Sequence, residues 1–271
     1  MSTLNFLYKT KMGRIFLRLL ISKPVSDFSG FLLDSKFSKS IIKSFAKKNN
    51  IDLNDYILDD IGSFNDFFCR RIKPELRPID TEESHLVTPC DGLLKVIPIE
   101  EGKVFPVKQS IFTIKDLLQD DELAESFEGG YCLVYRLCVN HYHRYGYFET
   151  GVKKQDVVIP GVYHTVRPIA LEAGPVFVQN SRQYTVIETE RFGKCVQMEV
   201  GAMLVGRIVN EQPSEASVFR GAEKGHFEYG GSTIIVLIPK NVARIDEKLI
   251  AASNNGEETP VVMGQSIGGT I

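Results

Sequence analysis

The sequence has few cysteines and no long apolar run. Its five cysteines are Cys69, Cys90, Cys132, Cys138 and Cys195, and no two of them form a CxxC pair. The odd number and the wide spacing argue against a disulfide framework and against a zinc site, so a reducing, cytoplasmic environment is the expectation. No apolar stretch reaches the length that spans a bilayer, and no cleavable signal peptide is expected.

Several functional signatures are also missing. The chain contains no P-loop, GxGxxG, HExxH or GxSxG motif, and nothing in it is typical of nucleic-acid binding. His141 and His143 form an HxH pair, but no acidic or cysteine cluster completes a metal site beside them. We therefore predict no nucleic-acid partner and no metal ion.

Charge is distributed unevenly along the chain. Residues 1–50 carry ten lysines and arginines against two aspartates, a net charge of +8, so the other 221 residues must sum to −10. Phe37, Ile41, Ile42 and Phe45 recur at helical spacing among the lysines. A basic amphipathic helix suits an anionic membrane surface; the alternative is an ordinary helix packed on the domain, with its lysines in solvent. We predict a helical, membrane-associating region over residues 1–80.

A second helix is expected within that region. Ile57, Ile61, Phe64 and Phe68 share one helical face. Ser63 with Asp66 resembles a capping box, which indicates that a helix restarts there. The helical region is expected to end at the Arg77–Asp80 segment, which contains a proline.

Residues 81–271 have a different pattern, with short apolar or alternating runs separated by glycine and proline. The expected strands are 93–97, 104–107, 131–137, 184–187, 195–200, 203–209 and 233–238. One helical insertion is expected over residues 114–125. The fold class is therefore α+β, with a helical N-terminal region followed by a mainly antiparallel β catalytic domain.

The strongest chemical signal is Gly230-Gly231-Ser232-Thr233, which enters the apolar run 234–238. The glycines leave the backbone free and uncrowded, so that Ser232 Oγ could attack the carbonyl of Gly231 and convert the peptide bond to an ester. β-Elimination would then leave an N-terminal pyruvoyl group. By itself this pattern is more typical of a turn. Asp91 could orient a histidine that deprotonates Ser232, and His143 could exchange protons with a substrate.

Seven segments of the chain carry a resemblance to a known family. They are Phe64–Arg70 with Arg77–Ile79 (FNxFFxR…RPI), Pro89–Gly92 (PxDG), Tyr142–Arg144 (YHR), Asn180–Arg182 (similar to NER), Val200–Gly206 (VGAxxVG), Lys224–Phe227 (KGHF) and Gly231–Thr233 (GS[ST]). In this order and spacing they resemble the motifs of the phosphatidylserine decarboxylases, a family of pyruvoyl enzymes. The resemblance runs from about residue 60 to residue 240.

The resemblance implies an autoprocessing zymogen that is cleaved between Gly231 and Ser232. The products would be a β chain of 231 residues and an α chain of 40 residues, and the α chain would begin with a pyruvoyl cofactor made from Ser232. The implied reaction converts phosphatidylserine to phosphatidylethanolamine and CO2 through a Schiff base with the pyruvoyl group. Asp91 and a histidine would assist cleavage, and His143 would be the acid/base of decarboxylation.

One position departs from the family pattern. Bacterial members read YHRxH, and their second histidine pairs with the aspartate for cleavage; this chain has Gly146 there. We hypothesise that His164 takes the role of that histidine. In the alternative, His143 serves both steps.

The resemblance and the basic N-terminus together imply an anionic phospholipid membrane as partner. We expect a peripheral protein on the cytoplasmic side of the cell membrane, and the sequence leaves a homodimer open. Arg144 and Arg182 are candidates by charge for binding the head-group phosphate; the alternative for both is a surface salt bridge.

Three other functions are kept as alternatives. The first is an unprocessed lipid-binding pseudoenzyme, which Gly146 favours. The second is a hydrolase that uses Ser232, His143 and Asp91, although Ser232 lacks a nucleophile elbow. The third is a pyruvoyl decarboxylase that acts on another serine lipid or on an amino acid.

Overall fold

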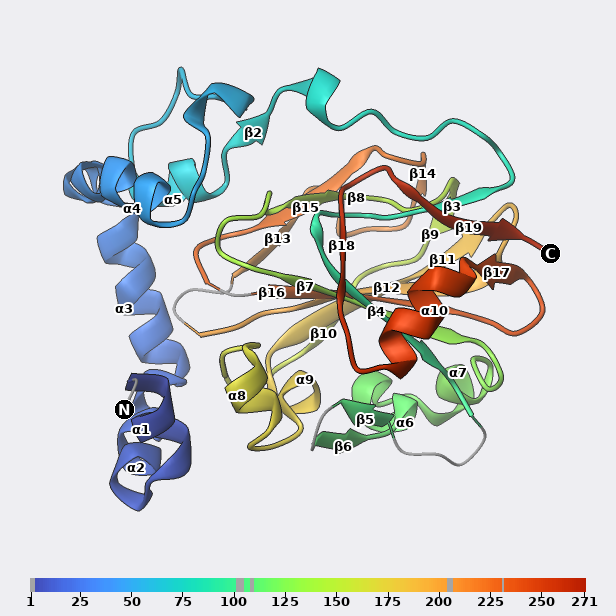
Figure 1. The fold of residues 1–271 in the computed structure, drawn as a ribbon, viewed down its shortest axis with the longest axis horizontal. Coiled ribbons are helices and arrows are strands. Elements are labelled where there is room, and N and C mark those ends of the chain that lie inside the picture. The colour runs from blue at the N-terminus through green and yellow to red at the C-terminus, as the bar shows by residue number, and fades with distance from the viewer. Residues whose placement is uncertain (1–2, 101–104, 108–109, 204–206, 231) are drawn as a thin grey trace.

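The computed structural model describes residues 3–100, 105–107, 110–203, 207–230 and 232–271. Its centre is a nine-stranded sheet, in which eight strands follow the order β14-β9-β11-β12-β16-β7-β4-β18 and β10 pairs with β11 (Figure 1). The nine strands are β4 (Gly92–Pro98), β7 (Tyr131–Leu137), β9 (Gly151–Lys153), β10 (Val157–Ile159), β11 (Arg182–Thr189), β12 (Gly193–Val200), β14 (Ala216–Val218), β16 (Ser232–Ile238) and β18 (Thr259–Val261).

All the ladders of this sheet are antiparallel, which confirms the predicted sheet type. Its central strands are buried on both faces, because alternate residues of a strand enter two different hydrophobic clusters. On β16, Ile235 and Leu237 belong to one cluster, whereas Ile234 and Val236 belong to the other. Burial on both faces explains why this strand reads as an uninterrupted apolar run.

Two smaller three-stranded sheets and a C-terminal helix lie around one face of the main sheet (Figure 1). One sheet has the order β13-β15-β8 and the other β17-β19-β3. The elements are β3 (His85–Val87), β8 (Arg144–Gly146), β13 (Ile208–Asn210), β15 (Glu223–Phe227), β17 (Ala243–Ile245), β19 (Ser266–Thr270) and α10 (Glu247–Asn254). Phe227, Tyr145, Ile245 and Ile267 from these sheets join the cluster that contains Ile234.

The opposite face is covered by short helices, with a small hairpin beside them (Figure 1). These elements are β5 (Phe105–Val107), β6 (Ser110–Phe112), α6 (Ile114–Leu118), α7 (Asp121–Glu125), α8 (Pro168–Leu171) and α9 (Val176–Gln179). The helix predicted over 114–125 is therefore wrong as a single element. Gln119 has φ 54°, in the left-handed region, and the Asp120 side chain caps a new helix by accepting a hydrogen bond from the Leu123 N–H.

The N-terminal region is helical, as predicted, and forms a column beside the β domain (Figure 1). Its elements are α1 (Thr3–Lys9), α2 (Lys11–Leu20), α3 (Lys23–Leu33), η1 (Lys36–Ile41), α4 (Ile42–Lys48), η2 (Leu53–Asp55), β1 (Tyr56–Ile57), α5 (Phe64–Phe68), β2 (Arg71–Ile72) and η3 (Pro74–Leu76). Leu7, Tyr8 and Leu17 pack into the same cluster as Ile235 of the main sheet. The boundary at residue 80 stays a prediction, since apolar side chains pack across it.

Three further predictions need correction. The capping box of Ser63 and Asp66 is confirmed, but the helix it starts is only five residues long, and Ile57 lies in β1. Of the strand expected over 203–209, Met203 lies in a turn, residues 204–206 lie outside the described residues, and a strand begins at Ile208. Of the residues expected on one helical face, Ile42 is buried, whereas Phe37 is 90% exposed.

The structure contains no helix, among the residues it describes, that is long and apolar enough to cross a membrane.

Candidate active site

Ser232 opens the central strand β16. Its register pairs it with Leu137 of β7, and Thr233 pairs with Val200 of β12. Ser232 is completely buried, and its Oγ has no hydrogen-bond partner among the described residues. Gly230 has φ 148°, a backbone conformation that glycine adopts far more readily than other residues. Gly231, the predicted cleavage residue, lies outside the described residues. A buried hydroxyl without a partner is costly, so Ser232 stands out as a candidate functional residue.

The alternation of β16 places Ser232 on the same face as Ile234 and Val236. The hydrophobic cluster on that face also contains Cys90 and Tyr145. Asp91 follows the first of these in sequence, and His143 lies two residues before the second. The folded chain therefore brings the Asp91 and His143 segments to the face of the sheet on which Ser232 lies.

His143 has one occupied and one free ring nitrogen. Its Nδ1 lies 2.9 Å from the backbone oxygen of His141. Because a carbonyl oxygen only accepts, Nδ1 carries the hydrogen and the neutral ring has its lone pair on Nε2. Nε2 is buried without a partner among the described residues. Burial, reinforced by the charge of Arg70, holds the pKa of His143 well below its usual value, so the ring is neutral near pH 7 and Nε2 can accept a proton.

Aromatic contacts connect His143 to the Gly230 segment. The ring of His143 lies 4.1 Å from that of Phe68, centroid to centroid, and Phe68 lies 5.1 Å from Tyr229 in an edge-to-face arrangement. The Phe227 N–H donates to the backbone oxygen of His143 at 3.0 Å. His143 and the segment that leads to Ser232 are thus held by one packed unit.

Asp91 is bound by an arginine. Arg77 Nε and Nη2 donate to its two carboxylate oxygens at 2.7 and 2.5 Å, and the Met263 N–H donates to Oδ1 at 2.9 Å. This bidentate pair is largely buried. His141 is also affected by this carboxylate, because the charge of Asp91 opposes the lowering of the His141 pKa by burial. No direct hydrogen bond joins Asp91 to a histidine among the described residues.

Gly146, the position of the family departure, is tightly enclosed. Its N–H donates to Pro89 O at 2.8 Å, and its carbonyl accepts from Gln197 Nε2 at 3.0 Å. A Cβ at this position would lie 3.0 Å from Ala222 O and 3.1 Å from Gly221 O. A histidine here would therefore require the neighbouring backbone to move.

His164 is placed away from the Asp91 segment, against the first helix. Its Nδ1 lies 3.1 Å from the hydroxyl of Tyr8, which also accepts from the Thr165 N–H. Asn180 fixes the backbone of His164 by accepting from its N–H at 2.8 Å and by donating to its carbonyl at 2.8 Å. The same Asn180 amide donates to Gly201 O at 2.7 Å. This network joins the N-terminal helix to the loops beside β16.

The two arginines proposed for the head group occupy other places. Arg182 is buried and donates to the backbone oxygens of Leu117, Val178, Asn180 and Asp116 at 2.7 to 3.2 Å. Burial lowers its pKa to about 10. Arg144 donates to Cys69 O at 2.7 Å and pairs with Glu223. Arg182 thus holds α6 and α9 against the sheet, and neither arginine lines the cavity described next.

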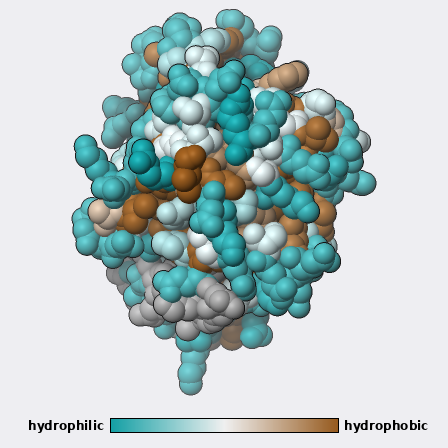
Figure 2. All heavy atoms as spheres, turned by 90° about the vertical axis from the view of Figure 1, so that its right-hand side faces the viewer, coloured by the Kyte–Doolittle hydropathy of each residue, from teal (hydrophilic) through white to brown (hydrophobic). Residues whose placement is uncertain are grey.

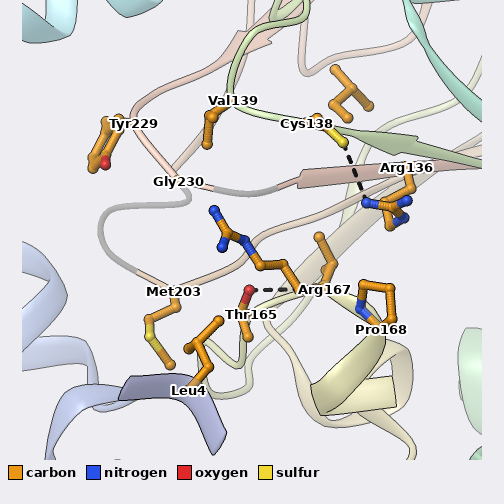
Figure 3. Close-up of a pocket in the computed structure, with 12 residues that line it drawn as sticks. Leu4, Arg136, Cys138, Val139, Thr165, Arg167, Pro168, Met203, Tyr229 and Gly230 are labelled. Atoms are coloured by element: carbon orange, nitrogen blue, oxygen red, sulfur yellow. Dashed lines mark hydrogen bonds between the residues drawn. The ribbon is translucent and has the colours of Figure 1, made fainter. Parts of the chain in front are cut away.

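A cavity of about 390 Å³ lies beside Gly230 (Figure 3). Its walls are mainly apolar and come from α1, the end of β7 and the 165–168 loop. The lining residues are Leu4, Arg136, Leu137, Cys138, Val139, Thr165, Val166, Arg167, Pro168, Met203, Tyr229 and Gly230. A mainly apolar cavity with a few polar groups, close to a buried serine, is typical of a ligand site.

One group of metal-type ligands occurs elsewhere, formed by Glu211, Glu223 and His226, whose ligand atoms lie within 4.8 Å of one another. Glu223 already pairs with Arg71 at 2.6 Å and with Arg144. These cations compensate its charge, so the group offers little attraction to a metal ion. The prediction of no metal site stays a prediction.

Sequence reasoning missed three residues of the site. Arg77 was recognised only as part of a motif, and its pairing with Asp91 joins positions 14 residues apart. Asn180 is the first residue of the NSR segment, and its side chain fixes the loops at His164 and Gly201 by hydrogen bonds. The sequence had instead suggested Arg182 of this segment, as a ligand of the head-group phosphate. Arg167 carries no motif signal, and only the fold brings it to the cavity.

Comparison with known proteins agrees with the motifs. A family model described as "Phosphatidylserine decarboxylase" matches residues 64–269. A phosphatidylserine decarboxylase proenzyme of Ruminiclostridium cellulolyticum is 40% identical, over 99% of this chain and 91% of the relative. A phosphatidylserine decarboxylase proenzyme 2 of Clostridium acetobutylicum is also 40% identical, over 98% and 91%, and a phosphatidylserine decarboxylase proenzyme of Clostridium perfringens is 39% identical, over 98% and 92%. The chain belongs to the phosphatidylserine decarboxylase family.

Proposed function

We propose that this protein is an autoprocessing, pyruvoyl-dependent decarboxylase that converts phosphatidylserine to phosphatidylethanolamine and CO2. The observation that carries the proposal is Ser232, a fully buried serine whose hydroxyl has no partner in the described part of the chain, at the position of the family's processing motif. Its relatives are named as proenzymes, which fits a precursor that yields an α and a β chain.

The residues present fit a pyruvoyl group at position 232. A pyruvoyl carbonyl supplies the electron sink that loss of CO2 from an amino acid requires. Ser232 offers the hydroxyl, Gly230 the unusual backbone conformation, and the adjacent cavity the room for a substrate. Apolar side chains such as Leu137 and Val139 line that cavity and exclude water from the reacting atoms.

We assign both proton-transfer roles to His143. Before cleavage, its Nε2 accepts the proton of Ser232 Oγ: the lowered pKa keeps the ring neutral, and the lone pair on Nε2 has no partner among the described residues. During turnover, Nε2 takes up from the solvent the proton that decarboxylation consumes and delivers it to the substrate carbon that has lost CO2. Asp91 supports cleavage indirectly. Arg77 holds its carboxylate in place, and its negative charge opposes the lowering of the His141 pKa by burial.

The competing assignment of His164 to cleavage remains testable. His143→Ala is expected to abolish cleavage, whereas His164→Ala is expected to leave it intact, because His164 contacts Tyr8 on the face of the sheet opposite to the Asp91 segment. Cleavage of the His143 variant together with failure of the His164 variant would reverse the assignment. Each variant is scored by the two fragment masses after equal incubation.

We also propose that the N-terminal helices bind an anionic membrane, on the cytoplasmic side of the cell membrane. Met12, Ile15, Phe16 and Leu19 of α2 are 50–63% exposed at helical spacing, and Phe28 and Phe31 of α3 are 62% and 72% exposed. Leu4 of the neighbouring α1 lines the cavity, so a lipid held at these helices could extend its head group toward Gly230.

The opposite side of the molecule does not share this character. Figure 2 shows the side away from the N-terminal helices, on which hydrophilic side chains predominate. Phe16→Asp with Phe31→Asp is expected to reduce sedimentation with anionic phospholipid vesicles. Phe219→Asp is the matched control, because Phe219 is 66% exposed outside this region. Equal vesicle binding by all forms would refute the membrane assignment, and analytical ultracentrifugation of the same preparations tests for a homodimer.

The deciding experiment on the function is the intact mass of the purified protein beside its Ser232→Ala variant. Two fragments from the wild type, the shorter one blocked by pyruvoyl, and one uncut variant chain support the proposal. A single full-length mass for both would favour the lipid-binding pseudoenzyme. An uncut chain labelled at Ser232 by a serine-reactive probe would favour a hydrolase, and a substrate panel separates phosphatidylserine from other serine lipids and amino acids.

A further inference from the structure

The cavity beside Gly230 carries only positive charge. Of its twelve lining residues, Arg136 and Arg167 are charged and none is acidic. Arg136 is already neutralised, because its Nε donates to Glu258 Oε1 at 3.0 Å and its Nη2 pairs with the other carboxylate oxygen. Its Nη1 donates to Cys138 Sγ at 3.3 Å. Among the described residues of the cavity wall, one cation without a compensating partner therefore remains.

That cation is Arg167. Figure 3 shows its guanidinium extended across the cavity toward Gly230. Within the described residues, its hydrogen bonds come from its backbone alone, including the N–H that donates to Thr165 Oγ1 at 3.4 Å. The charge of Arg167 also opposes the raising of the Tyr229 pKa by burial. Arg167 is exposed, so its guanidinium reaches both the solvent and the cavity, and no acceptor for it occurs among the described residues. A cation in this position can bind an anion that enters from outside.

The chemistry of the reaction selects which anion it binds. The substrate of the proposed function carries a phosphodiester and a carboxylate, and the carboxylate loses its charge as CO2 departs. A cation on that carboxylate would stabilise the ground state more than the transition state and would slow the reaction. The phosphodiester keeps its charge throughout, and the planar guanidinium fork matches its oxygens.

We propose that Arg167 binds the phosphodiester of the substrate head group at the mouth of the Gly230 cavity. This inference rests on the proposed function for the identity of the lipid. It gives Arg167 the role that charge alone suggested for Arg144 and Arg182, both of which are bonded elsewhere. Bound in this way, the phosphate places the serine group deeper in the cavity, toward residue 232.

Steady-state kinetics of the processed enzyme on phosphatidylserine in detergent micelles tests the role. Arg167→Ala is expected to cleave itself as the wild type does and to raise KM about 10- to 100-fold, the range for losing a hydrogen bond to a charged group, with kcat changed much less. Arg167→Lys keeps the charge without the planar fork, so its KM is expected to lie between those of the wild type and Arg167→Ala. Arg244→Ala is the control, because Arg244 is an exposed arginine outside the cavity. An unchanged KM in processed Arg167→Ala would overturn the proposal.

A binding experiment separates this inference from the proposed function. Calorimetry with the uncleavable Ser232→Ala chain uses glycerophosphoserine in one arm and inorganic phosphate in the other. Introducing Arg167→Ala into this chain is expected to raise the dissociation constant of glycerophosphoserine about 10- to 100-fold. Little binding of inorganic phosphate is expected to either form. Arg167-dependent binding by the Ser232→Ala chain, together with a wild type that fails to decarboxylate phosphatidylserine, would refute the proposed function and keep the phosphate site. Equal glycerophosphoserine binding with and without Arg167 would refute the site.

Discussion

Replacing Thr233 by valine is expected to make the uncut protein more stable. Thr233 is completely buried in β16, and its Oγ1 has no hydrogen-bond partner among the described residues. Burying a hydroxyl without a hydrogen bond costs about 1–3 kcal/mol, and valine has nearly the same shape without that cost. Thr233→Val should therefore raise the free energy of unfolding by about 1–3 kcal/mol.

The chain offers a control for the same substitution. Thr185 in β11 is also completely buried, but its Oγ1 donates to Lys154 O at 2.8 Å. Thr185→Val removes this bond and leaves a carbonyl unpaired, so it should lower the free energy of unfolding by about 1 kcal/mol or more. The two substitutions remove the same atoms and are predicted to differ in sign.

Urea unfolding at equilibrium measures both effects. Each substitution is made in the Ser232→Ala background, so that an uncut chain is compared with an uncut chain. Equal destabilisation by both would mean that the Thr233 hydroxyl has a stabilising partner in the folded protein, and the argument from the unpaired hydroxyls of β16 would fail. A gain at Thr233 and a loss at Thr185 would show that β16 keeps a hydroxyl at the expense of stability, as functional sites do.

Three further predictions concern the neighbourhood of the site. Gly146→His in the uncut background should lower the unfolding free energy by about 1–3 kcal/mol, because its Cβ would lie 3.0 Å from Ala222 O; faster cleavage at unchanged stability would contradict this. His226 has a folded pKa of about 4, lowered chiefly by burial, against about 6.5 when unfolded. Its neutral form therefore stabilises the fold above pH 6.5, and this contribution is lost as the pH falls toward 4. Between pH 7.5 and pH 5.5, the free energy of unfolding in urea should fall by about 1 kcal/mol more for the wild type than for His226→Gln. An equal pH dependence of this free energy in the two proteins would exclude His226 as the cause. Tyr8→Phe should cost about 1 kcal/mol, because Tyr8 loses its contacts to His164 and to the neighbouring backbone; unchanged stability by the same assay would show that the contact is weak.

The sequence predicted best where one pattern was both strong and local. The strands β7 and β16 match the predicted runs within a residue, because burial on both faces required continuous apolar residues. The Ser63 capping box was also readable, since both partners lie within one helical turn. The helix predicted through Ile57 was wrong, because pairing of Ile57 with Arg71 in β1-β2 outweighed the helical spacing.

The chemistry of the site was readable only in part. The motifs identified Ser232, Asp91 and His143, which the fold gathers on one side of the main sheet. No motif indicated that Arg77 binds Asp91 or that Arg182 donates its hydrogen bonds to backbone oxygens. Charge type is visible in a sequence, but the partner that neutralises a charge depends on which distant segments the fold brings together.

The sequence by itself determined the family, the processing motif and the antiparallel β character, because each depends on residue identity and short-range spacing. Only the tertiary structure decided which nitrogen of His143 has no partner among the described residues, how closely the backbone approaches Gly146, and which arginine faces the cavity without a partner in the described part of the chain. These properties depend on burial and on contacts between segments far apart in the chain.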